Sequence, residues 1–324
     1  MVPSGIDSQV WHQHAWRNRL QSFFLLALMG GFLALLGWLL WGDLGLAMLL
    51  MLGLLAVLFT PILSPLMVMR LYGARPILPQ QAPVLAQLMR ELSERAGLDY
   101  VPQLYYVPSQ VLNAFATGGR EHAAIAITDG LLRTLDLREL AGVLAHELSH
   151  VRNKDLRVLG LADLLSRATS LLALLGQFLL LINLPLMLLG MVTLNWYAIA
   201  LLLTAPLFSA LAQLALARTR EYDADLNAAR LTGDPDGLAS ALYKLEQIQG
   251  GWMEQLFMPS RRAPQPSPLR SHPLTEERIR RLQALKPELS RRPLSEPITL
   301  EDWLPGFAPR VTRAPRRHRS GLWH

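Results

Sequence analysis

Two long apolar runs without charged residues fill most of the start of the chain. Residues 21–41 contain no Asp, Glu, Lys or Arg, and after Asp43 a second uncharged run covers residues 44–69. At about 1.5 Å per residue, each run is long enough to cross the roughly 30 Å hydrocarbon core of a bilayer. The first run is also longer than the apolar part of a signal peptide, which has about 7–15 residues. The pattern predicts a transmembrane hairpin over residues 20–70.

A third and longer uncharged run covers residues 168–217. Asn183, Pro185 and Asn195 lie near its middle and favour a turn between two further spans. The alternative is one buried hairpin inside a soluble core, but soluble cores rarely contain uncharged runs of this length. We therefore predict a second transmembrane hairpin and a four-span membrane protein.

Basic residues flank the predicted spans on one side only. The short connections within the two hairpins contain neither Lys nor Arg. The outer flanks carry Arg17, Arg19, Arg70, Arg75, Arg157, Arg167, Arg218 and Arg220. Because Lys and Arg beside span ends mark the cytoplasmic side, we predict a multi-pass protein of the inner or plasma membrane. The polar segments between and after the hairpins would face the cytoplasm.

The predicted hairpins divide the rest of the chain into four segments. Residues 1–19 form an N-terminal cytoplasmic segment, and residues 287–324 form a tail rich in Pro and Arg that predicts irregular structure. Residues 71–167 and 218–286 are polar, and neither has the pattern of a complete domain alone. We therefore expect them to form the two halves of one domain.

Within the first half, the periodicity predicts a helix over residues 81–96 and strands over residues 103–107 and 123–128. A further helix begins at about Leu137, where Asp136 and Glu139 have the spacing of an N-cap and its N3 partner.

The second half begins as a helix that continues out of the fourth span and ends near Gly233, a favourable residue for a helix C-terminus. The chain is therefore expected to be mainly α-helical with a small β-sheet.

The amino-acid composition limits the kinds of chemical site and partner that this chain can have. Hydrophobic residues make up 51% of the 324 residues and charged residues 17%, whereas soluble globular chains carry about 25% charged residues. The absence of cysteine excludes disulfides, a thiolate zinc site and a cysteine nucleophile. The formal net charge is +6, with much of the excess in the tail at Arg310, Arg313, Arg316, Arg317 and Arg319. This tail predicts weak attraction to anionic lipids; because no nucleic-acid motif accompanies it, we expect the bilayer and not nucleic acid as a partner.

The strongest chemical pattern is His146-Glu147-Leu148-Ser149-His150. Residues four apart share one face of a helix, so both imidazoles can reach one ion. Zinc suits neutral imidazole ligands, and a glutamate beside the first ligand can act on water at the metal. Two unrelated histidines on a solvated face are the alternative. The preceding residues 140–145 are apolar and small, however, and charged groups set into such a helix need a compensating partner. We expect one Zn²⁺ per chain, with Glu147 as the catalytic base.

Two histidines leave the site incomplete, because catalytic zinc usually has three protein ligands and one open position. Residues 151–155 contain no third histidine at metzincin spacing. The best remaining donors are Glu221 and Asp225, which follow the fourth predicted span and lie four residues apart on one helix face. One can bind the metal while the other accepts a hydrogen bond from a ligating histidine, and spacing alone does not rank them. An ordinary charged cluster on a helix surface is the alternative.

Together these motifs resemble the HtpX-type heat-shock metalloproteases, relatives of the CAAX prenyl endopeptidases. The resemblance rests on the HExxH pattern, the Glu-x-x-x-Asp pair and their placement around a transmembrane hairpin. It also includes residues 113–118, which are similar to the family's NAFATG segment, and it runs from the first span to about Leu285. Further similar features are Asn153 with Asp155, and Ser271-His272-Pro273 followed by Arg278-Ile279.

The resemblance implies a gluzincin fold in which a later helix supplies a glutamate ligand. It implies that Glu221 is the third ligand, that Asp225 accepts a hydrogen bond from a ligating histidine, and that His272 helps hold the oxyanion of the tetrahedral intermediate. It also implies that a substrate cleft lies near an edge strand, beside Asn113, Ala114, Phe115, Ala116, Thr117 and Gly118. The sequence pattern alone predicts a turn leading into a strand for that segment.

The combined expectation is a membrane-embedded zinc endopeptidase that acts on proteins or peptides. Zinc would lower the pKa of its water toward about 7 and polarise the scissile carbonyl, and Glu147 would accept the water's proton and pass it to the leaving amine. By resemblance, the substrates are damaged or misfolded membrane proteins.

There are three alternatives to this function. A prenyl-protein endopeptidase is an alternative, although such relatives have more than four spans. A catalytically silent membrane scaffold is a second alternative, against which the intact HExxH pattern argues. A transporter is disfavoured because the predicted spans contain no ionisable residue.

Overall fold

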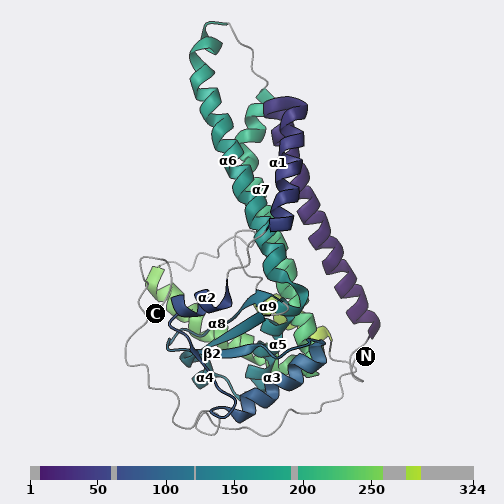
Figure 1. Cartoon of the computed structure of the whole chain (residues 1–324), viewed down its shortest axis with the longest axis vertical. Coiled ribbons are helices and arrows are strands. Elements are labelled where there is room, and N and C mark those ends of the chain that lie inside the picture. Colours follow the sequence, from purple (N-terminus) through teal and green to yellow (C-terminus); the bar gives the residue numbers. More distant parts are fainter. Residues whose placement is uncertain (1–7, 60–63, 120–121, 191–195, 258–274, 286–324) are drawn as a thin grey trace.

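The computed structural model describes residues 8–59, 64–119, 122–190, 196–257 and 275–285. Long helices rise from a compact domain that contains the sheet (Figure 1). These are α1 (Ser8–Phe59), α6 (Asp155–Leu188) and α7 (Trp196–Thr232). The mainly helical chain with one small sheet confirms the predicted fold class. We use the name catalytic domain for the described residues from 64 to 153 and from about 218 to 285, which include the sheet.

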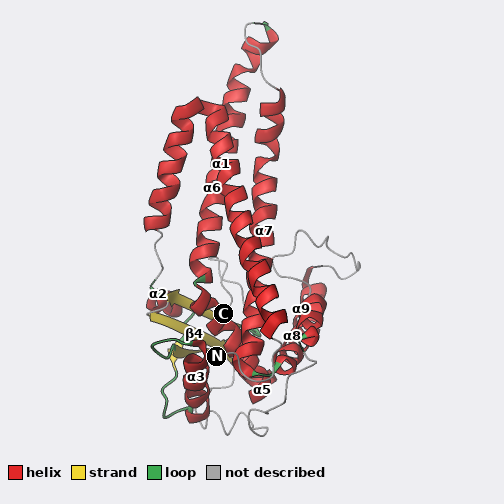
Figure 2. Cartoon of the chain, turned by 90° about the vertical axis from the view of Figure 1, so that its right-hand side faces the viewer, coloured by secondary structure: helices red, strands yellow, loops and turns green. Residues whose placement is uncertain are grey.

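Helix α1 is two helical arms joined by a kink at Gly42. The backbone there has φ 64° and ψ −147°, a region that glycine adopts readily because it has no Cβ. The chain reverses direction at this kink, and the second arm returns toward the catalytic domain (Figures 1 and 2). The first predicted hairpin therefore has its turn where the apolar pattern is interrupted by Asp43.

Three helices among the described residues are long and apolar enough to cross a membrane: Trp11–Met48, Asp155–Leu186 and Ile199–Thr232. The chain is thus a multi-span membrane protein. The fourth predicted span, residues 44–69, falls partly on residues 60–63, outside the described part, and stays a prediction.

The structure shows two differences from the expected spans. Residues from Pro65 onward form a separate short helix, α2 (Pro65–Leu71). In the second hairpin, Asn183 and Pro185 lie within α6 rather than in a turn, and Asn195 lies outside the described residues.

The long helices pack through small residues and interleaved aliphatic side chains. Met29, Leu33 and Leu36 of α1 are buried against α6 and α7, which contribute small residues such as Ala173 and Ala205. Small residues let helices in a membrane approach closely, so that contact rather than hydrophobicity holds them together. The outward-facing side chains remain large and apolar, as lipid contact requires.

The sheet has four strands in the order β1-β2-β4-β3 (Figure 2). These are β1 (Arg75–Pro76), β2 (Gln103–Val107), β3 (Ala114–Gly119) and β4 (His122–Thr128). Strands β2 and β4 are parallel, and the other pairs are antiparallel. The two predicted strands are confirmed. Residues 114–119 form an edge strand, as the resemblance implied, rather than a turn that precedes one.

The two faces of the sheet are covered differently. Tyr106, Ile125 and Ile127 point into the main core, which includes helices α3 (Pro83–Ala96) and α5 (Leu137–Asn153). The alternate residues Val107, Ala124 and Ala126 pack against Met69 of α2. The sheet is therefore buried on one face by the helices of the catalytic core and on the other by α2.

Helix α5 begins as predicted. Asp136 accepts a hydrogen bond from the backbone N–H of Glu139, whose side chain accepts from the N–H of Asp136, completing a capping box. The Glu139 carboxylate also accepts from Ser240 and Lys244 of α8 (Pro235–Phe257). These contacts fix the start of α5, and so the motif that follows it.

Helix α7 continues without a break from the membrane span into the catalytic domain. It ends at Thr232, and Gly233 follows with φ 70°, as predicted. Helix α9 (Thr275–Ala284) packs against α8 and α7, and the short helix α4 (Asp129–Thr134) follows β4. The first residues of α1 also contact the catalytic domain, because Trp11 and Ala15 are part of its core.

Candidate active site

The two histidines of the HExxH motif lie one turn apart on the face of α5 that is turned toward α7. Both side chains are largely buried, and their rings meet edge to face with centroids 4.7 Å apart. Their Nε2 atoms are 3.1 Å apart. The prediction that both imidazoles converge on one point is confirmed.

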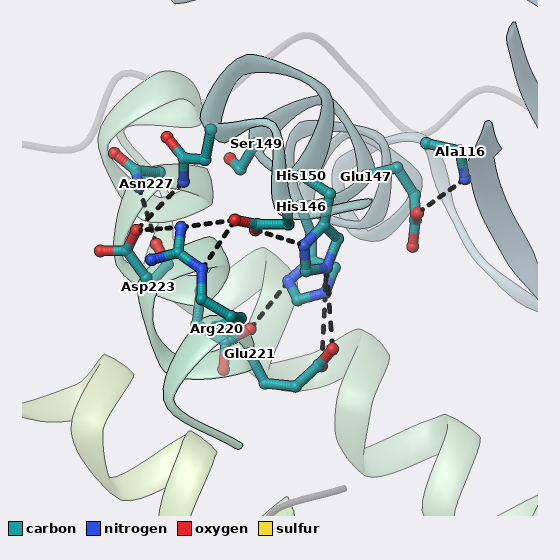
Figure 3. Close-up of polar contacts among 12 residues, drawn as sticks. Ala116, His146, Glu147, Ser149, His150, Arg220, Glu221, Asp223 and Asn227 are labelled. Carbon is teal, nitrogen blue, oxygen red and sulfur yellow. Dashed lines mark hydrogen bonds and ion pairs between the residues drawn. The ribbon is translucent and has the colours of Figure 1, made fainter. Parts of the chain in front are cut away.

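Helix α7 supplies the carboxylate nearest to that point. The Oε2 of Glu221 lies 3.6 Å from the Nε2 of His146, and its Oε1 lies 3.7 Å from the Nε2 of His150. Donor atoms of the three residues all lie within 4.8 Å of one another. Figure 3 shows the imidazoles pointing toward Glu221 across the gap between the two helices.

The opposite ring nitrogens each face another carboxylate. The Nδ1 of His146 lies 3.0 Å from the Oδ1 of Asp225, although the groups are not aligned as a linear hydrogen bond. The Nδ1 of His150 lies 2.8 Å from the Oδ2 of Asp155. Because an ionised carboxylate only accepts hydrogen bonds, Asp155 and Asp225 favour a proton on Nδ1 of each ring. With a metal ion in place of the second proton, each Nε2 would then offer its lone pair to that ion.

This arrangement suits a zinc ion. Zinc–nitrogen bonds of about 2.0–2.1 Å in tetrahedral geometry separate two nitrogens by about 3.3 Å, close to the 3.1 Å observed. The surroundings also favour a cation. Burial opposes a charged imidazole, but the carboxylates of Asp225 and Glu221 outweigh it and raise the pKa of His146 to about 10. A pocket that stabilises a proton at this position also stabilises a metal ion in its place.

Two buried arginines hold the carboxylates behind the histidines. Arg278 of α9 donates to both oxygens of Asp225, at 2.7 and 2.6 Å, and its Nη1 lies 3.4 Å from Glu221. On the other side, Arg220 of α7 donates to Asp155 at 2.7 Å. Each histidine is thus backed by a carboxylate that is itself fixed by an arginine, which is how the partners of metal-binding histidines set ring orientation.

The sequence had indicated only part of this support. Asp225 lies 3.0 Å from Nδ1 of His146, and its role in holding that ring stays a prediction. Asp155 and Arg278 belong to the family-like segments of the sequence, and Arg220 to the basic flank of a span, but none of these patterns indicates the contacts with the site. The available signal for Asp155 was its position five residues after His150, at the start of the next helix.

Glu147 projects to the other side of the motif, away from Glu221. Its Oε2 accepts a hydrogen bond of 3.0 Å from the backbone N–H of Ala116 on β3 (Figure 3). Burial raises the pKa of Glu147 above its ordinary value, although the neighbouring His146 and His150 act in the opposite direction. The carboxylate therefore lies between the two histidines and the edge strand.

The segment predicted to lie beside a substrate cleft is brought to this side of the site. The carbonyl of Asn113 accepts from the N–H of Thr128, 3.1 Å away, so that β3 pairs with β4 from its first residue. In an antiparallel pair alternate residues turn their backbone groups outward, and the bond from Ala116 to Glu147 shows that the even-numbered residues do so here. His272 lies outside the described residues.

Comparison with known proteins identifies the family. The model of peptidase family M48 matches residues 79–286, which is more than half of the chain. The chain belongs to peptidase family M48. It is a zinc metallopeptidase with membrane spans, and its His-His-Glu group is the metal-binding set that the family's HExxH pattern and later glutamate require.

The relatives of this M48 peptidase cover most of its length. It is 37% identical to a "Protease HtpX homolog" of Acaryochloris marina, over 68% of this chain and 78% of the relative. A second "Protease HtpX homolog", from Desulfatibacillum aliphaticivorans, is 34% identical over 85% of this chain and 92% of its own. The resemblance drawn from the motifs is confirmed.

A solved structure, that of S. mikatae Ste24p, matches with a TM-score of 0.45 and 20% identity, over 83% of this chain and 66% of that protein.

Proposed function

We propose that this M48 peptidase is an endopeptidase that cleaves misfolded or damaged membrane proteins at the cytoplasmic face of the membrane. The observation that carries the proposal is the position of Glu147. Its carboxylate is 3.0 Å from the backbone of the edge strand β3 and is adjacent in the chain to a metal-facing histidine. A base in this position can reach a peptide bond lying between the strand and the metal.

In this proposal His146, His150 and Glu221 bind one Zn²⁺ per chain. Asp225 and Asp155 hold the ligating rings in the Nδ1–H tautomer, and their arginine partners keep the carboxylates in place. A bound zinc ion supplies a Lewis acid that polarises the scissile carbonyl and makes water more acidic.

Glu147 then performs the proton transfers. It accepts a proton from the attacking water and delivers it to the leaving amine. His272 is proposed to hold the developing oxyanion with a hydrogen bond.

An extended substrate would add to the outer edge of β3, along residues Asn113 to Gly118. The outward-facing backbone groups of Ala114 and Gly118, with the carbonyl of Ala116, are the hydrogen-bonding positions such a strand would use, because the N–H of Ala116 already donates to Glu147. Recognition through the backbone depends little on side chains, which fits an enzyme that removes damaged proteins of many sequences. The relatives named "Protease HtpX homolog" support proteolysis, and the basic flanks of the spans support a cytoplasmic site.

The test is to purify the full-length protein in detergent, load it with zinc and measure cleavage of casein and of an unfolded membrane protein. Both should be cut at internal bonds, and a chelator should stop the reaction. Cleavage only at chain ends, or only next to a prenylated cysteine, would contradict the proposed endopeptidase. Orientation is tested with reporters fused after Arg75 and Leu285, both of which should read as cytoplasmic.

A further inference from the structure

Helix α2 has one face on the sheet and an opposite face that is apolar and exposed. Met69 is buried against the strands at 1% exposure, whereas Leu66, Met67 and Leu71 are exposed by 57%, 56% and 53%. Residues four apart share a helix face, so Leu66 lies beside Arg70, and Met67 beside Leu71. These four residues and Ser64 line a shallow recess on the outside of the catalytic domain.

The position of this face points to the membrane. Helix α2 follows the second arm of α1, and in both views it lies on the side of the catalytic domain nearest the long helices (Figures 1 and 2). Five residue steps separate Phe59 from Ser64, which allow at most about 18 Å of chain. Helix α2, with its exposed apolar face, is therefore tethered on the side of the domain from which the long helices rise.

The charges on this face match a lipid surface. Arg70 is exposed in the middle of the apolar group and Arg75 is exposed just beyond it, and neither has an ion-pair partner among the contacts of the described residues. A short helix that exposes leucine and methionine together with an arginine is suited to the boundary between headgroups and acyl chains, where the long arginine side chain can reach the headgroups. Arginine near anionic headgroups adds further attraction.

Helix α2 is also fixed to the edge strand β3. The rings of Tyr72, directly after α2, and Phe115 of β3 have centroids 4.7 Å apart. At the other end of the strand, Gly118 lies so close to Pro65 that an added Cβ would be 2.7 Å from the proline Cγ. Because α2 and β3 are in contact at both ends of the strand, a surface that binds α2 also lies next to β3.

We propose that α2 is an interfacial helix, with Leu66, Met67 and Leu71 in contact with membrane lipid. It thereby holds β3, and the substrate strand that would pair with it, next to the bilayer. The substrate class that follows is polypeptide anchored in the membrane and cut in the extended segment that emerges from it. This consequence rests on the proposed function, whereas the membrane contact of α2 does not.

Lipid contact can be tested directly because the chain has no cysteine, so that a single introduced cysteine carries a unique label. Met67→Cys and Leu78→Cys are a matched pair: the two native side chains are 56% and 50% exposed. Leu78 lines a recess together with residues of α3, and α3 lies on the side of the domain away from the long helices (Figure 1). Each full-length variant is labelled with an environment-sensitive fluorophore and reconstituted in liposomes that contain anionic lipid.

The label at residue 67 should be quenched by lipids carrying a nitroxide at a depth of about 5–10 Å below the headgroups, and protected from aqueous iodide. The label at residue 78 should show the opposite pattern. Equal iodide quenching at both positions, without lipid quenching at residue 67, would overturn the proposal. Protection of residue 67 only after casein is added would also overturn it, and would make this face part of the substrate site. Leu71→Cys repeats the test should Met67→Cys fail to retain zinc.

The consequence for substrates is tested with Leu66→Asn combined with Leu71→Asn, and with Leu78→Asn as the control. In liposomes, the double variant should cleave a membrane-anchored reporter several-fold more slowly while cleaving soluble casein at the wild-type rate. Equal rates on the anchored reporter would refute the substrate class. If wild type cleaves neither substrate, the proposed function fails, while the quenching result still decides the lipid contact.

Discussion

Glu221 and Asp225 lie one turn apart on α7, and removing the charge of either is predicted to damage the zinc site in a different way. Glu221 faces the Nε2 atoms of both histidines at 3.6 and 3.7 Å. Asp225 faces only the Nδ1 of His146, at 3.0 Å. Glu221→Gln replaces a ligand by a much poorer donor, whereas Asp225→Asn leaves an oxygen that can still accept from the ring.

The size of each effect follows from these positions. Loss of a partner that orients a ligand costs about 10–100-fold in metal affinity, or about 1.4–2.7 kcal/mol. Asp225→Asn should fall in this range, and activity should return with excess zinc. Glu221→Gln should exceed about 100-fold and show no recovery. Asp225→Asn should also lower stability, because it takes from the buried Arg278 the carboxylate that accepts both of its short hydrogen bonds and leaves only Glu221 at 3.4 Å.

The assay is competition for zinc between the purified protein and a chelator of known affinity, with circular dichroism to show that each variant is folded. Glu277→Gln is the control, since it removes the same charge from surface pairs with Arg280 and Arg281. Its zinc affinity should equal that of wild type. If Asp225→Asn lowers zinc affinity more than Glu221→Gln in folded protein, Asp225 is the ligand and the assignment is wrong.

Three further predictions concern stability and the metal. Arg278→Met should lower the free energy of unfolding by about 3–5 kcal/mol, because it leaves a buried carboxylate without its arginine. The control Arg280→Met breaks an exposed pair on the same helix and should lower it by at most about 1 kcal/mol. Equal losses of stability in denaturant melts would contradict the importance of the buried pair. Gly118→Ala should lower the melting temperature more than Gly73→Ala. Both glycines have a positive φ, but only at Gly118 would the added Cβ clash, at 2.2 Å from a backbone oxygen. Melting temperatures in the reverse order would refute this. Chelation should abolish proteolysis and added Zn²⁺ should restore it, whereas activity that persists in zinc-free protein would exclude the metal mechanism.

Sequence alone predicted the features that depend on spacing along one element. The uncharged runs predicted the long helices, and the i, i+4 histidines predicted a shared face on α5. The capping box at Asp136 and the helix end at Gly233 were likewise local patterns. In each case the residues that decide the outcome lie within one or two turns of each other, so no knowledge of the tertiary structure was required.

The features that were missed depend on how separate helices pack. Glu221 and Asp225 share one face of α7, so spacing could not rank them. The structure separates them because each meets a different nitrogen of the α5 histidines. The pairing of Asp155 with Arg220, across 65 residues, has no signature in the sequence. Helix α2 was not predicted because most of it lies within the uncharged run of residues 44–69. Pro65 was an available signal that a new helix begins there.

The most direct test of zinc-dependent catalysis by Glu147 is a comparison of wild type with Glu147→Gln, measuring zinc content and casein cleavage on the same samples. Glu147 points toward β3 and not toward the converging Nε2 atoms. The variant should therefore keep the wild-type amount of zinc and lose proteolysis. Loss of zinc from the folded variant, or near-normal turnover with zinc bound, would contradict the role of Glu147 as the base.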